Sequence, residues 1–128
     1  MNKKKLLIRL SSLVIFIFFL NFIASRLYWY SSIWWFDMPM HFLGGAFLAL
    51  AYLYIFSPVK FSIWKLLLAV LLVGVGWEVF EIAVDEAVAK NGIALLDILS
   101  DLCFDLVGGA AASLYYLKRI VPKHESGV

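Results

Sequence analysis

Four stretches of about 20 mainly apolar residues restrict the fold of this chain more than any other feature. A helix needs about 20 such residues to cross the ~30 Å hydrocarbon core of a bilayer. The stretches cover residues 6–24, 38–56, 63–84 and 93–117, with ends good to a few residues. Apolar residues make up 64% of the 128 positions, more than a soluble domain of this length can bury. The sequence therefore predicts an all-α integral membrane protein, a single domain over residues 1–128 folded as a four-helix transmembrane bundle.

Positive charges orient the predicted helices. If both termini are cytoplasmic, most Lys and Arg residues fall on the cytoplasmic side: Lys3, Lys4, Lys5, Arg9, Lys60, Lys65, Lys118, Arg119 and Lys123. Only Arg26 and Lys90 fall on the outer side. Lys and Arg concentrate in cytoplasmic loops, so the sequence predicts a multi-pass plasma (inner) membrane protein with both termini inside. No small-x-small cleavage site follows the first stretch, which is therefore interpreted as a retained anchor.

The acidic residues follow the opposite pattern. All but Glu125 fall in the outer half of this topology: Asp37, Glu78, Glu81, Asp85, Glu86, Asp97, Asp101 and Asp105. Side chains three or four residues apart share one face of a helix. The groups with this spacing are Asp37 with His41, Glu78 with Glu81 and Asp85, and Asp97 with Asp101 and Asp105. Small residues flank each face and allow close helix packing, so we expect the three faces to meet below the outer surface.

A shift of 64 residues aligns the second predicted helix with the fourth. Seven of the seventeen positions from 37 to 53 are then identical, and His41 meets Asp105. This pattern fits an ancient duplication of a helical hairpin, although two membrane helices rich in Gly, Ala and Leu also resemble each other by chance. A true repeat of this kind would make the two helices parallel.

Carboxylates within the hydrocarbon are costly, at about 3 kcal/mol each. Arg26 and Lys90 are loop residues, so the chain offers almost no cation to balance them. A divalent metal ion would do so, and oxygen ligands with one imidazole suit magnesium, manganese, calcium or zinc. The predicted metal ligands are His41, Glu78, Glu81, Asp101 and Asp105. Shared protons along a proton pathway are the alternative.

Further roles follow from the same positions. His41, Glu78 and Asp105 are the predicted catalytic residues, while Asp37, Asp85 and Asp97 are expected to orient the ligands from around them. Structural explanations compete for three of these residues. Asp37 precedes Pro39 as a helix N-cap would, Asp97 suits a helix N-terminus, and Asp85 is suited to a solvated loop.

These motifs resemble those of the VanZ-like and YjdF-like small bacterial membrane proteins. The resemblance rests on an Asp-x3-His helix start at Asp37, a Trp-Glu-x2-Glu element at Trp77 and an Asp-x3-Asp ladder from Asp97. It covers about residues 37–117, and the Trp-Glu-x2-Glu element is closer to the YjdF-like branch. The resemblance implies a plasma-membrane location and a role in the cell envelope, without an established reaction.

Three functions fit this pattern. The first is a metal-dependent enzyme that acts at the outer leaflet on a membrane lipid or lipid-linked envelope precursor, by phosphoester hydrolysis or phosphoryl transfer. The second is an ion- or proton-coupled transporter or relay, which four short helices would form as a homo-oligomer. The third is a non-catalytic membrane factor with a structural metal or lipid site. No nucleic-acid partner is expected.

Overall fold

The computed structural model describes residues 2–56, 60–84 and 94–121, and they form five helices. The helices are α1 (Lys3–Arg26), α2 (Trp29–Ser32), α3 (Asp37–Phe56), α4 (Ile63–Val84) and α6 (Leu95–Arg119). The prediction of an all-α membrane protein is confirmed, and the four long helices begin and end within three residues of the expected positions. The single turn of α2 was not predicted, because four residues are too few to show a periodic pattern.

Three helices, α1, α3 and α4, are long and apolar enough to cross a membrane. The 25 residues of α6 also suffice in length, but this helix is not among the apolar candidates. Its first half carries Asp97, Asp101 and Asp105, whose carboxylates interrupt the apolar sequence. Length and composition thus support three of the four predicted transmembrane helices. The fourth, α6, is less apolar because of its acidic face.

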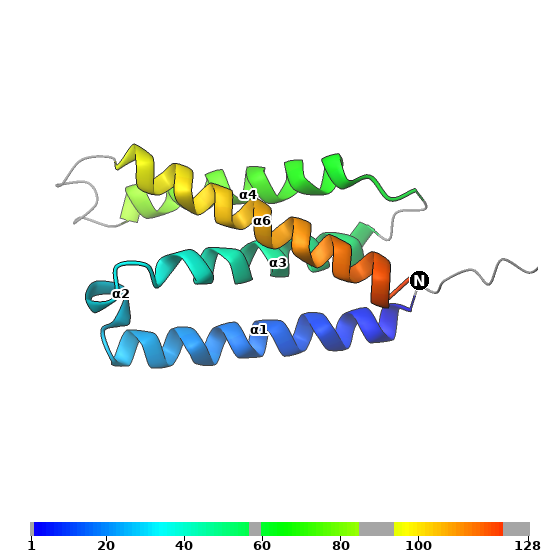
Figure 1. Cartoon of the computed structure of the whole chain (residues 1–128), viewed down its shortest axis with the longest axis horizontal. Coiled ribbons are helices and arrows are strands. Elements are labelled where there is room, and N and C mark those ends of the chain that lie inside the picture. Colours follow the sequence, from blue (N-terminus) through cyan, green and yellow to red (C-terminus); the bar gives the residue numbers. More distant parts are fainter. Residues whose placement is uncertain (1, 57–59, 85–93, 122–128) are drawn as a thin grey trace, which may run out of the picture.

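Successive long helices run in opposite directions, so α3 and α6 are parallel (Figure 1). The most extensive packing in the molecule is between these two helices, while α1 packs on the other side of α3 (Figure 1). The start of α3, the start of α6 and the end of α4 lie at the same end of the bundle (Figure 1). At the opposite end, the Lys5 ammonium donates a hydrogen bond to the Arg119 carbonyl. The first and last described helices therefore meet on one side.

Glycines allow α3 and α6 to approach closely. A Cβ atom at Gly45 would overlap the backbone carbonyl of Asp105, and one at Gly108 would overlap that of Phe42. The two contacts are reciprocal, one glycine from each helix against the backbone of the other. We refer to this contact between α3 and α6 as the glycine seam. Towards the end of the bundle that holds Lys5, an apolar core includes Leu53, Leu66 and Tyr116. The glycine seam therefore separates an apolar end from the acidic end.

Candidate functional site

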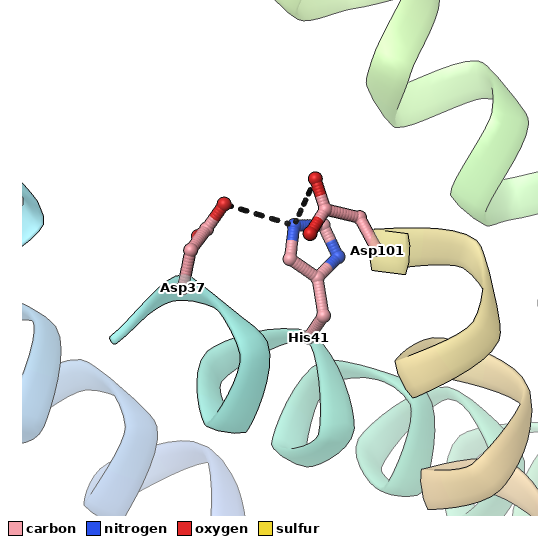
Figure 2. Close-up of side chains that lie close together, drawn as sticks. All are labelled: Asp37, His41 and Asp101. Atoms are coloured by element: carbon pink, nitrogen blue, oxygen red, sulfur yellow. Dashed lines mark ion pairs between the residues drawn. The ribbon is translucent and has the colours of Figure 1, made fainter. Parts of the chain in front are cut away.

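His41 is the centre of the acidic end of the bundle. Its Nε2 atom lies 3.7 Å from Asp37 Oδ2 and 3.7 Å from Asp101 Oδ2 (Figure 2). Its Nδ1 atom lies 3.2 Å from Asp105 Oδ1, within hydrogen-bond distance. Both ring nitrogens therefore face carboxylates, and these carboxylates come from two helices.

The parallel arrangement of α3 and α6 explains this geometry. Asp37 and His41 are one helical turn apart on α3, as are Asp101 and Asp105 on α6. The glycine seam brings the two turns side by side and in the same direction. As a result, Asp101 and Asp105 reach the two different nitrogens of one imidazole ring.

Asp105 is buried where three helices meet. Its side chain is only 8% exposed. Its Oδ1 atom faces His41, whereas its Oδ2 atom lies so close to Gly74 of α4 that a Cβ there would be 2.7 Å away. Gly74 therefore provides the space in which this carboxylate fits between α3, α4 and α6.

Glu78 adds a buried carboxylate from α4, one turn beyond Gly74. The residue is 6% exposed, and its Oε1 atom has no hydrogen-bond partner among the residues that the structure describes. Glu78 lies within electrostatic range of His41, Asp105 and Glu81. Glu78 is one helical turn from Gly74, which contacts Asp105, so it lies on the face of α4 turned towards α6. A buried carboxylate oxygen without a partner is unfavourable, which points to a ligand or proton at this position.

Three residues form a group that could hold a metal ion. One ligand atom from each of Asp37, His41 and Asp101 lies within 4.8 Å of the others. Asp37 was expected only to orient the ligands, yet it lies in this group. Asp105, expected to be a ligand, instead faces the other nitrogen of His41.

The remaining predicted site residues lie further out. Asp97 is exposed in the first turn of α6. Glu81 is half-buried and lines the pocket described below. Asp85 lies outside the described residues.

A pocket of about 690 Å³ opens beside this cluster, between α1, α3 and α4. Polar residues line one end of it: Asn21, Tyr30, Asp37, His41, Glu81 and Asp105. Most of the remaining lining is apolar, including Phe18, Phe47 and Trp77, and no Lys or Arg is among the lining residues that the structure describes. The pocket therefore combines an acidic end with an apolar end.

Sequence reasoning missed two polar residues of this pocket. The Tyr30 hydroxyl donates a hydrogen bond of 2.7 Å to Asn21 Oδ1 and so links α2 to the end of α1. Burial, reinforced by the carboxylates of Asp37 and Glu81, raises the pKa of Tyr30, so its hydroxyl remains a donor at neutral pH. Neither residue has a helical-spacing partner in the sequence, so no pattern pointed to them.

One family profile matches residues 2–121, which is nearly the whole chain. The chain belongs to the family described as Predicted membrane protein (DUF2238). The predicted membership of the VanZ-like and YjdF-like proteins was therefore wrong. Its motifs were short, and their spacings recur on any polar face of a membrane helix, so they do not separate such families. This DUF2238 member is a multi-pass membrane protein by its family and its apolar helices. No curated protein and no solved structure matches it.

Proposed function

We propose that this DUF2238 member is a membrane-embedded enzyme that uses a divalent metal ion held by Asp37, His41 and Asp101. Its substrate would be a lipid or lipid-linked envelope precursor of the outer leaflet, changed by phosphoester hydrolysis or phosphoryl transfer. The observation that carries the proposal is the group of three ligand atoms within 4.8 Å of one another. One imidazole with carboxylate oxygens suits magnesium, manganese, calcium or zinc.

The surroundings of His41 support a metal at its Nε2 atom. A metal-binding histidine usually donates its other ring N–H to a carboxylate, which sets the tautomer and the ring orientation. Asp105 is positioned to accept that hydrogen bond from Nδ1. The Nε2 lone pair would then face Asp37 and Asp101, the two carboxylates of the group.

We assign the role of general base to Glu78, because it is a buried carboxylate on the α4 face that contacts Asp105 through Gly74. It is buried beside the cluster but is not in the three-ligand group, and one of its oxygens is unpartnered among the described residues. A bound cation would supply charge stabilisation for phosphoryl oxygens. Glu78 would accept a proton from the attacking water or hydroxyl group. No Lys or Arg is among the described residues that line the pocket, which also supports a cation, because an anionic head group there would face several carboxylates without a basic side chain to balance them.

We propose that α6 is the fourth membrane span and that both termini are cytoplasmic. Asp101 and Asp105 are buried against α3, whereas Val107 and Leu114 on the same helix are exposed. Lipid would therefore contact the apolar face of α6 while the acids face the bundle interior. The Lys5–Arg119 hydrogen bond supports a common side for the two ends. Cysteine introduced by Ser31→Cys in a Cys103→Ala background should react with an impermeant reagent added from outside. Labelling only from the cytoplasmic side would contradict this topology.

Transport or a relay is the second candidate, because buried carboxylates can share protons. The pocket, however, ends in apolar residues such as Phe47 and Leu48. This favours a site open towards one face over a path through the membrane. Cation-dependent flux in liposomes without lipid turnover would favour the relay, which would require a homo-oligomer.

Metal content of the detergent-purified protein tests the proposal. The wild type should bind divalent metal, and His41→Ala and Asp101→Asn should lose it. Asp97→Asn is the matched control, because Asp97 is an exposed carboxylate one turn from Asp101 on the same helix. Equal metal content in all four proteins would contradict the site. So would a wild type that contains no metal and whose melting temperature does not change when EDTA is added.

Catalysis is tested separately with Glu78→Gln. This variant should retain its metal and lose roughly 10²- to 10⁴-fold in turnover of mixed membrane lipids, followed by mass spectrometry. A wild type that binds metal but turns over no lipid would leave a structural metal site and refute the enzyme.

A further inference from the structure

We infer that the pocket between α1 and α4 binds one hydrocarbon chain of an outer-leaflet lipid, with the lipid head group beside Asp37 and His41. This inference rests on the proposed function and identifies how that site would select its substrate. It gives a role to the apolar part of the pocket, which takes no part in metal binding.

The polarity of the lining changes along the pocket. Asn21 of α1, Asp37 of α3 and Glu81 of α4 line the end near the start of α3. About two to three helical turns further along, the lining includes Val14, Leu48, Val73 and Phe47, with Asp105 beside Gly44 and Gly74 between the two regions. The same change from polar to apolar runs along a lipid molecule from its head group to its chain.

The length of the pocket corresponds to one leaflet. From Asp37 to Leu48 the pocket follows α3 over eleven residues, which is about 16 Å at ~1.5 Å per residue. This is about half of the ~30 Å hydrocarbon core. A volume of about 690 Å³ also lies within the range of small-molecule sites. A chain from the outer leaflet would therefore fill the pocket and end near the middle of the bilayer.

The lining chemistry favours a hydrocarbon chain over a peptide. The deep part of the pocket is formed by helices, whose backbone N–H and C=O groups bond within each helix. An extended peptide there would leave its own backbone groups unpaired. A lipid chain has no such groups and needs only apolar contacts, which Val14, Phe47 and Val73 provide.

The bundle also leaves a route for a chain to enter from the membrane. The helix α1 packs mainly on α3 and to a smaller extent on the short helix α2, but it makes no extensive contact with α4. The pocket lies between these two helices and has one wall from each. A lipid in the outer leaflet could thus move its chain sideways between α1 and α4 without crossing an aqueous phase.

Substitutions at the apolar end test the inference. Val73→Trp and Val14→Trp would fill the deep part of the pocket, and both valines are about half exposed, so folding should tolerate the larger side chains. Val75→Trp is the matched control, since Val75 lies on α4, is similarly exposed and does not line the pocket. The probes are alkyl phosphates of increasing chain length, with binding to the detergent-purified full chain measured by native mass spectrometry.

In the wild type and in Val75→Trp, affinity should rise roughly fourfold for each added methylene until the pocket is full. In Val73→Trp and Val14→Trp the rise should stop at a shorter chain, with a loss of about tenfold or more for the longest probe, equivalent to roughly two methylenes. The same chain-length dependence in all four proteins would overturn the inference. Alkyl maltosides distinguish this inference from the proposed function. Their head groups are neutral, so their binding in the pocket does not require a metal ion. Suppose that the wild type contains no metal, but that the affinity for alkyl maltosides stops rising at a shorter chain in Val73→Trp than in the wild type. This result would refute the metal site and support the chain pocket.

Discussion

The glycine seam between α3 and α6 and the gap between α1 and α4 show two outcomes of helix packing within one small bundle. At the seam, Gly45 and Gly108 let the two backbones touch. At the gap, Phe18 and Trp77 lie on helices that do not pack extensively on each other, and a pocket remains. Burial of apolar surface cannot drive helices together in lipid, so close fit decides where they associate. Small residues produce the seam, and bulky residues on separated helices produce the gap.

The two regions also divide the polar and apolar roles. The seam brings Asp101 and Asp105 of α6, both buried, to the two ring nitrogens of His41. The gap meets this cluster at its acidic end and continues along apolar walls. A rigid seam beside an accessible pocket is what a site needs when it must hold reactive groups and admit a membrane ligand.

The largest expected effect is the loss of the seam. Gly108→Val should prevent folding, because its side chain would overlap the Phe42 backbone of the facing helix, at a cost of about 4 kcal/mol or more. The measurement is the yield and thermal unfolding of monodisperse protein in detergent. Gly76→Ala is the control, because a Cβ there meets open space, and a helical Gly→Ala change should stabilise by up to about 1 kcal/mol. Equal stability of the two variants would show that the seam does not determine packing.

An intermediate effect is expected when the Asp105–His41 contact is weakened by a side chain of the same shape. Asp105→Asn should retain the fold but lower metal affinity roughly 10- to 100-fold, because the His41 ring would lose its carboxylate partner at Nδ1. Metal titration with the purified protein measures this, and Asp97→Asn again serves as the control. Unchanged affinity would show that Asp105 does not position His41.

The smallest effect is expected at the end of the gap that holds Asn21 and Tyr30. Tyr30→Phe removes the hydrogen bond to Asn21 that links α2 to α1, and should cost about 0.5–1 kcal/mol in unfolding free energy. Tyr28→Phe is the control, since Tyr28 is 75% exposed. If both variants unfold like the wild type, this end of the pocket is stabilised by other contacts.

Helical period accounts for the part of the site that the sequence predicted. Because side chains recur every 3.6 residues, His41, Asp101 and Asp105 could be assigned to helix faces before any coordinates were known. Apolar length, with Pro, Gly and charged residues at the ends, placed the four long helices within three residues of their observed ends. It could not distinguish Asp37 from Asp105 as a neighbour of the His41 Nε2 atom, because that depends on how far α6 is shifted and rotated against α3.

The sequence by itself determined an all-α membrane protein whose ionisable residues gather on helix faces near one end. Apolar length and helical spacing suffice for that, since both are local properties of the chain. Only the tertiary structure decided which carboxylate faces which nitrogen of His41, that Tyr30 and Asn21 complete the polar end of the pocket, and that a gap remains between α1 and α4. These features depend on the separation and rotation of whole helices, which contacts between distant residues set and which no local pattern records.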